Sequence, residues 1–254
     1  MNPDVAGWIT QALATDAPLL PTLDAMQVWL HLGWSVVLAW LAASLVRRGR
    51  WTVALLVALW AWAPGAYSPA YWLGLAFQGP SVATVLLCAG GLWEGLGLAP
   101  HSWNIAPAAW VAQRSAQVKE ETAQRAGDTE QNAVPLKLLA DRRILVLSVL
   151  GAVTGWALLL DTLALLPLQM YAWGFSPLAV GLIAVASLMP WVWGLAGGTA
   201  PAWRLAVVPL AVLVFVVWRL PSGNVWDAVL DPLLWIALQV QLARFFWSRY
   251  KNRS

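Results

Sequence analysis

The sequence has few charged residues and almost none of the side chains from which disulfides and metal clusters are built. Only 11% of the 254 residues are Asp, Glu, Lys or Arg, whereas soluble domains carry about 25%. The single cysteine, Cys88, excludes an internal disulfide and a cysteine-based metal cluster. The two histidines, His31 and His101, lie far apart and provide no ligand pair at helical spacing. We therefore expect no metal site and no cofactor.

Apolar residues take the place of the missing charge. They make up 60% of the chain, and the mean hydropathy is +0.66. A soluble fold of this size could not hide so much apolar surface in one core, because much of its area must still face water. The 20 tryptophans favour a membrane–water interface, where an indole ring has apolar contacts on one side and hydrogen-bonding partners on the other. The composition predicts an all-α fold, a polytopic bundle of transmembrane helices.

Seven stretches have the length and apolar character expected of membrane spans. Charged residues or Pro and Gly interrupt the chain between them. The stretches lie at about 25–46, 51–65, 81–98, 144–166, 178–195, 203–220 and 225–246. We interpret residues 1–254 as a single integral membrane domain, with a polar cytoplasmic loop at 113–143 between the third and fourth spans.

The distribution of basic residues predicts the orientation of these spans. With seven spans and an outside N-terminus, fourteen of the fifteen Lys and Arg residues fall on the cytoplasmic side, and only Arg219 falls outside. Such asymmetry is the positive-inside pattern of membrane proteins, and a missed helix would disrupt it. It also explains the pI of about 9.4 without nucleic acid as a partner. The cytoplasmic residues are Arg47, Arg48, Arg50, Arg114, Lys119, Arg125, Lys137, Arg142, Arg143, Arg204, Arg244, Arg249, Lys251 and Arg253.

The first residues and the amino-acid composition indicate the cellular location of the protein. Residues 1–4 lack the basic region of a signal peptide, and the first long apolar run begins only near Ala25, so we expect no cleavable signal. Residues 5–15 either form a helix flat on the outer face or are unstructured. Abundant Ala, Gly, Pro and Trp, with Arg exceeding Lys, favours a bacterial genome rich in G and C. We expect a tryptophan-rich, multi-pass protein of the bacterial inner membrane.

Two carboxylates, Asp161 and Glu94, fall within the expected spans and form the candidate polar site. A charge at the centre of a bilayer costs about 2.5–3.5 kcal/mol on insertion scales, so each carboxyl must be neutral, paired or hydrated. One interpretation is a proton or cation relay, or a contact to a substrate. The other is that each carboxyl caps a neighbouring helix or pairs with a Gln or Ser side chain or a Trp N–H group. Asp161 lies towards the outside and Glu94 towards the cytoplasm, so we do not expect them to pair directly.

Two pairs of glycines have the GxxxG spacing that lets membrane helices approach closely. Gly91 and Gly95 lie in the third span, and Gly151 and Gly155 in the fourth. We expect these glycines to be helix-packing positions, and they suggest that the third and fourth spans contact each other.

No complete catalytic, metal-binding or nucleotide-binding motif accompanies these features. A hydrolase needs a nucleophile with a base in reach, and the two histidines are expected at opposite membrane faces, so an enzyme is disfavoured. A retinal protein is excluded because the seventh span has no lysine for a Schiff base. The leading hypothesis is a non-catalytic inner-membrane component: a scaffold, assembly or accessory subunit whose partners are the lipid bilayer and other membrane proteins. The alternative is a small-solute or proton-coupled transporter that uses Asp161.

Overall fold

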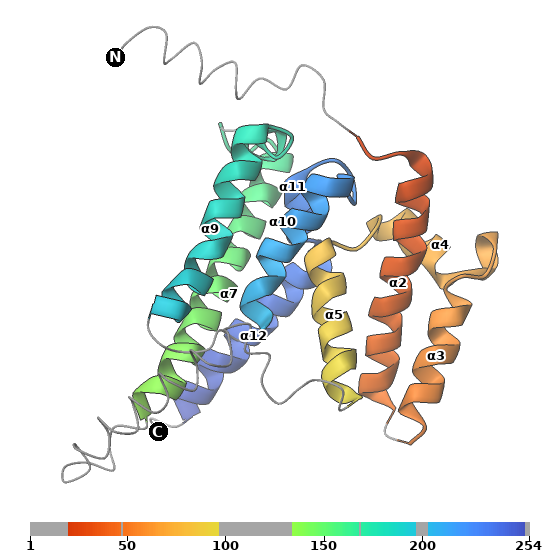
Figure 1. Ribbon diagram of the computed structural model, residues 1–254, viewed down its shortest axis with the longest axis horizontal. Coiled ribbons are helices and arrows are strands. Elements are labelled where there is room, and N and C mark those ends of the chain that lie inside the picture. Colours follow the sequence, from red (N-terminus) through yellow and green to blue (C-terminus); the bar gives the residue numbers. More distant parts are fainter. Residues whose placement is uncertain (1–19, 47, 97–133, 168, 197–202, 252–254) are drawn as a thin grey trace, which may run out of the picture.

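The part of the chain that the structure describes is built from α-helices. The computed structural model describes residues 20–46, 48–96, 134–167, 169–196 and 203–251, and no strand occurs within these ranges. The all-α prediction is confirmed. The longer helices run alternately up and down the molecule (Figure 1); they are α2 (Leu23–Leu45), α3 (Arg50–Trp60), α5 (Val82–Gly95), α7 (Val134–Thr162), α9 (Pro177–Ala196), α10 (Val207–Trp218) and α12 (Pro232–Lys251).

Short helices connect the longer ones at the end of the molecule where α2 begins (Figure 1). They are α4 (Pro69–Phe77), α8 (Met170–Trp173) and α11 (Val225–Val229), and a 3₁₀ turn at Gly65–Tyr67 precedes α4. Ser68 caps α4, because its hydroxyl accepts a hydrogen bond from the Ala70 N–H at 3.1 Å. A second 3₁₀ turn, Trp203–Ala206, leads into α10 at the opposite end.

Two of the described helices are long and apolar enough to cross a membrane on their own. They are α2 and the segment Leu145–Thr162 of α7. Helices α3, α5 and α10 have 11, 14 and 12 residues, which at 1.5 Å per residue is shorter than a hydrocarbon layer of about 30 Å. Helix α3 ends at Trp60, Ser81 caps the start of α5, and Arg219 ends α10 in the left-handed conformation. The seven-span count remains a prediction.

The seventh expected stretch, 225–246, is not one continuous helix. Helix α11 ends at Val229, Leu230 is extended, and α12 begins at Pro232. Asp231 causes this break by capping α12, since its Oδ1 accepts from the Leu234 N–H at 2.7 Å. Proline fits the first turn of a helix because the missing N–H has no partner there. A helix begins at Val225 as expected, but it ends after five residues, and the long helix of this stretch begins only at Pro232.

The fourth expected stretch begins earlier than its hydropathy indicated. Helix α7 starts at Val134, so the last residues of the expected polar loop at 113–143 are helical. The rest of that loop, the N-terminal segment 5–15 and His101 lie outside the described residues.

The core lies where α5, α10 and α11 meet α2. Phe215 and Val225 are fully buried there, together with Val82 at the start of α5. Trp29 of α2 joins this cluster, and its indole Nε1 donates to the Pro80 carbonyl at 3.0 Å. A second cluster, around Trp34, Val37 and Cys88, joins α2 to α5 and to the end of α3. The α5–α10 contact connects the N-terminal helices to the C-terminal ones.

The four glycines of the GxxxG pairs each face a large side chain from another helix. A Cβ added to Gly91 would lie 2.6 Å from Trp40 of α2, and one added to Gly95 would lie 3.0 Å from Trp51 of α3.

Gly151 and Gly155 in α7 instead face Leu238 and Trp235 of α12, and α7 packs mainly on α12. The expected contact between the third and fourth spans is therefore not among the main contacts between the described helices. An indole fills the space that each GxxxG pair would offer to another backbone.

Candidate functional site

Glu94 lies in the last turn of α5, at the end of the bundle where α3 begins (Figure 1). Its side chain is 42% exposed. The carboxylate accepts a hydrogen bond from the Trp203 indole at 2.5 Å and forms an ion pair with Arg204 at 3.4 Å. The structure therefore places Glu94 in a surface ion pair between α5 and the turn before α10.

Asp161 lies one residue before the end of α7, at the opposite end of the bundle. It is half-buried, and its Oδ2 accepts a hydrogen bond from the Tyr171 backbone N–H at 2.7 Å. This contact joins the end of α7 to α8, between two residues that are ten positions apart in the sequence. Asp161 and Glu94 are not brought together.

Beside Asp161, the structure assembles polar groups that the sequence analysis did not select. We call Asp161, Tyr171, Ser222, Asn224 and Asp227 the polar junction. The Asp227 carboxylate accepts hydrogen bonds from the Tyr171 hydroxyl at 2.8 Å and from the Ser222 hydroxyl. The Asn224 side-chain amide donates to the Tyr171 carbonyl at 2.9 Å. The junction joins the α7–α9 connection to the α10–α12 connection.

A local signal for part of the polar junction is present in the sequence. Asn224 with an acidic residue three positions later resembles a capping box, the pattern that begins a helix. In the structure Asn224 caps α11, because its Oδ1 accepts from the Trp226 N–H at 3.0 Å. Because one continuous span was expected over 225–246, a separate short helix beginning after Asn224 was not predicted.

The polar junction changes the acidity of two of its members. Burial raises the pKa of Asp227, and the negative charge of Asp231 adds to this, whereas the hydrogen bonds from Ser222 and Tyr171 lower it. Burial, the neighbouring Asp227 charge and the hydrogen bond to it also raise the pKa of the Tyr171 hydroxyl. Asp227 is thus a carboxyl group that favours its protonated form more than a free aspartate does.

A neighbouring carboxylate, Asp231, joins the beginnings of two helices. Its Oδ1 caps α12, and its Oδ2 accepts from the Ser81 backbone N–H, the residue that caps α5, at 2.7 Å. Helix N-termini carry partial positive charge and unpaired N–H groups, so one carboxylate stabilises both ends. Ser81 and Asp231 are 150 residues apart, and no local pattern predicts this contact.

Many indole N–H groups bind backbone carbonyls within the chain. These contacts hold loops against helices and use the polar part of each indole, so the exposed ring surface that remains is apolar. They are Trp34 to Gln78 at 2.9 Å, Trp60 to Tyr67 at 2.8 Å, Trp72 to Ala66 at 2.8 Å, Trp226 to Met170 at 2.9 Å and Trp235 to Ala152 at 3.2 Å.

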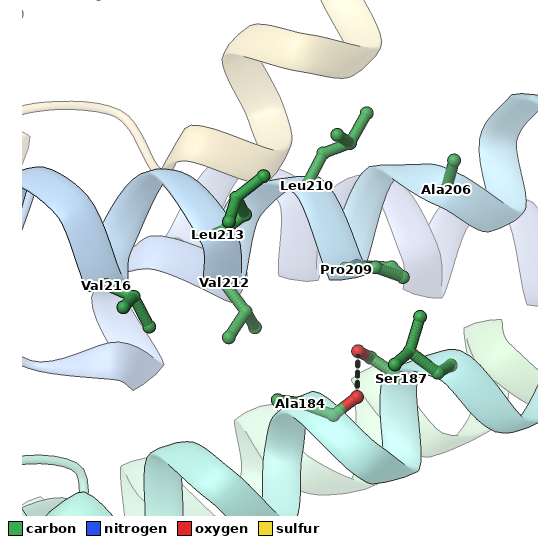
Figure 2. Close-up of a pocket in the computed structure, with 9 residues that line it drawn as sticks. Ala184, Ser187, Ala206, Pro209, Leu210, Val212, Leu213 and Val216 are labelled. Atoms are coloured by element: carbon green, nitrogen blue, oxygen red, sulfur yellow. Dashed lines mark hydrogen bonds between the residues drawn. The ribbon is translucent and has the colours of Figure 1, made fainter.

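An open apolar groove of about 460 Å³ is lined by residues of α9, of α10 and of the turn before α10. Figure 2 shows Val212 and Val216 of α10 pointing towards α9, while the Ser187 hydroxyl bonds the Ala184 carbonyl of its own helix at 2.8 Å. A groove lined in this way suits hydrocarbon and offers little to orient a polar substrate.

No group of three or more His, Cys, Asp and Glu side chains among the described residues is placed to hold a metal ion. Comparison of the chain with protein-family models, with curated proteins and with solved structures found no match.

Proposed function

We propose that the chain is a multi-pass protein of the bacterial inner membrane that works as a non-catalytic scaffold, assembly or accessory subunit of a larger membrane system. The observation that carries the membrane part is the low burial of its most apolar helices. Only 17% of the Leu145–Thr162 segment and 33% of the most apolar part of α2 are buried within the molecule. The core helix of a soluble protein would be mostly buried, because exposed apolar area costs about 25 cal/mol per Å² in water.

Exposed apolar side chains on the other helices support the same proposal. Leu55 and Leu59 of α3, Leu182 and Val185 of α9, and Val217 of α10 are each about 60% exposed. Contiguous apolar surface of this kind marks contact with a membrane or with partner proteins. In a bilayer the same surface contacts lipid tails and the apolar helices of other subunits.

The hydrogen bonding of the polar groups supports a non-catalytic role. Asp161 accepts a hydrogen bond from the Tyr171 backbone N–H. Glu94 accepts one from the Trp203 indole and pairs with Arg204. Asp231 accepts hydrogen bonds at the beginnings of two helices. These carboxylates are occupied in positioning the chain.

One observation favours the alternative, a proton-coupled transporter that uses Asp161. Asp161 and Asp227 both bind Tyr171, one through its backbone N–H and the other through its hydroxyl. Two carboxyl groups linked by one tyrosine could take part in proton transfer, and the raised pKa of Asp227 suits that role.

Substitution of Asp161 separates these two functions. Asp161→Asn keeps an oxygen that accepts from the Tyr171 N–H but removes the titrating carboxyl. For a scaffold, protein abundance, copurified membrane partners and the cellular phenotype should stay unchanged. A transporter variant would accumulate normally and lose the phenotype, which would contradict our proposal.

Asp161→Leu is the matched control for structure. It leaves the Tyr171 N–H without its acceptor, and a lost partner of this kind costs about 1–3 kcal/mol of stability. Copurification in mild detergent then tests the scaffold role directly. A membrane protein that copurifies at fixed stoichiometry supports the scaffold role. A chain that purifies without any partner, from cells that show the normal phenotype, refutes it.

A further inference from the structure

Two arginines converge on the C-terminal end of α5. Arg50, at the start of α3, donates from Nη2 to the Gly95 carbonyl at 2.7 Å. Arg204, in the turn before α10, contacts the neighbouring Glu94 through its own Nη2 at 3.4 Å. Because Glu94 and Gly95 are consecutive, guanidinium groups from two separate elements flank one helix end.

Each of these arginines lies over a tryptophan next to it in the sequence. The Arg50 guanidinium carbon is 4.7 Å from the centre of the Trp51 ring, and the Arg204 carbon is 5.7 Å from that of Trp203. Contact with an indole holds the guanidinium plane in place. We call Arg50, Trp51, Trp203 and Arg204 the arginine–tryptophan rim.

The rim has exposed hydrogen-bond donors and an excess of positive charge. Arg50 is exposed, and the Arg204 side chain is 55% exposed. A guanidinium has five N–H donors, and in each arginine one nitrogen makes the contact with α5. Exposed Arg48 adds a third positive charge in the adjoining turn, and among the described residues Glu94 provides a negative charge in contact with the rim. The complementary ligand is an anion with several acceptor oxygens.

Apolar surface next to the rim indicates an anion that also carries hydrocarbon. Trp93 and Leu96, at the same end of α5, are each 47% exposed, and Leu55 of α3 is 60% exposed. Helix α3 spans roughly 16 Å at 1.5 Å per residue, so in a bilayer of ordinary thickness its basic end would draw the headgroup layer inward. A phospholipid supplies phosphate at the level of the arginines and acyl chains along α3.

We propose that the arginine–tryptophan rim binds the phosphate of an anionic phospholipid, with the acyl chains along the exposed face of α3. This proposal rests on the proposed membrane location. The guanidinium groups bind phosphate oxygens through paired N–H donors, and the indoles lie at the level of the glycerol and carbonyl groups.

Thermal unfolding of the purified full-length chain in mild detergent tests the proposal. A thiol-reactive fluorescent maleimide reports unfolding through Cys88, which is only 7% exposed in the folded chain. Phosphatidylglycerol and phosphatidylcholine with identical acyl chains are added in separate experiments, and inorganic phosphate in a third. We expect excess phosphatidylglycerol to raise Tm by roughly 5 °C or more, and phosphatidylcholine and inorganic phosphate to leave it nearly unchanged.

Charge-removing variants assign the effect to the rim. In the double variant Arg50→Gln/Arg204→Gln, the shift specific to phosphatidylglycerol should be lost, whatever the Tm without lipid. Arg219→Gln is the matched control, because Arg219 also lies over an aromatic ring, that of Phe215 at 5.2 Å, but at the opposite end of α10. It should retain the full shift.

Three results would overturn the proposal: equal shifts with both lipids, a shift that survives in the double variant, or an equal shift with inorganic phosphate. If the double variant does not fold, native mass spectrometry of the unaltered chain decides by comparing the two lipids. Preferential retention of phosphatidylglycerol supports the site, and equal retention refutes it. Partner copurification is measured separately, so a failure of the lipid site is distinguishable from a failure of the proposed function.

Discussion

Replacing Asp231 with alanine should destabilise the molecule more than removal of an ordinary surface charge. The carboxylate makes two charge-assisted hydrogen bonds, to Ser81 N–H and Leu234 N–H, each 2.7 Å long. Such bonds contribute about 1.5–3 kcal/mol each. Because Asp231 is only half-buried, we take the lower value, which gives a loss of about 3 kcal/mol. At 2–4 °C per kcal/mol this lowers Tm by roughly 6–12 °C.

The maleimide assay at Cys88 measures this loss in detergent. Asp231→Asn keeps one carbonyl oxygen and should lie between the wild type and Asp231→Ala. Asp24→Ala is the control, because Asp24 is an exposed residue in the first turn of α2 and should change stability by less than about 1 kcal/mol. If Asp231→Ala unfolds within about 2 °C of the wild type, the carboxylate does not join α5 to α12 as we describe.

Two further predictions concern close packing and pH. Gly155→Ala should destabilise the α7–α12 pair by about 1–3 kcal/mol, because the added methyl would overlap the Trp235 ring. Gly181→Ala in α9 is the control, because a methyl added there meets no atom within 4 Å. Equal Tm values for the two variants would refute the close contact. Since burial raises the pKa of Asp227 above its ordinary 3.8, the folded state binds this proton more tightly than the unfolded state. The contribution of Asp227 to stability should therefore be fully present below pH 3.8 and be lost as pH rises through the folded-state pKa. The pH dependence of Tm measures this loss, and an unchanged dependence in Asp227→Asn would contradict it.

The sequence predicted the helical class and most helix positions because the apolar runs have clear ends. The first expected span, 25–46, agrees closely with α2 at Leu23–Leu45, and the fifth, 178–195, agrees with α9 at Pro177–Ala196. A double arginine ends the first run, and Pro177 and Gly197 flank the fifth. Hydropathy failed where a carboxylate interrupts an apolar stretch, as Asp231 does, because the average over a 20-residue window hides one charge.

The candidate site was less predictable because its contacts join distant parts of the chain. Asp161 and Glu94 were found from the sequence as carboxylates within apolar runs, but their partners, Tyr171 and Trp203, could not be. Tyr171 and Asp227 are 56 residues apart, and their hydrogen bond depends on how α8 and α11 pack together. The local spacing of hydrophobic residues does not predict a contact between residues so far apart in the sequence.

The membrane topology of the chain is the most direct test of our account, because the proposed function and the lipid site both depend on it. Reporter fusions after Arg50, within 120–132 and at Ser254 should all report the cytoplasm, and fusions near Ser68 and Asn224 should report the outside. Ser68 caps α4 and Asn224 caps α11, and both short helices lie towards the opposite end of the bundle from the start of α3 (Figure 1). An outside signal at Ser254, or a cytoplasmic signal at all five positions, would contradict the seven-span arrangement.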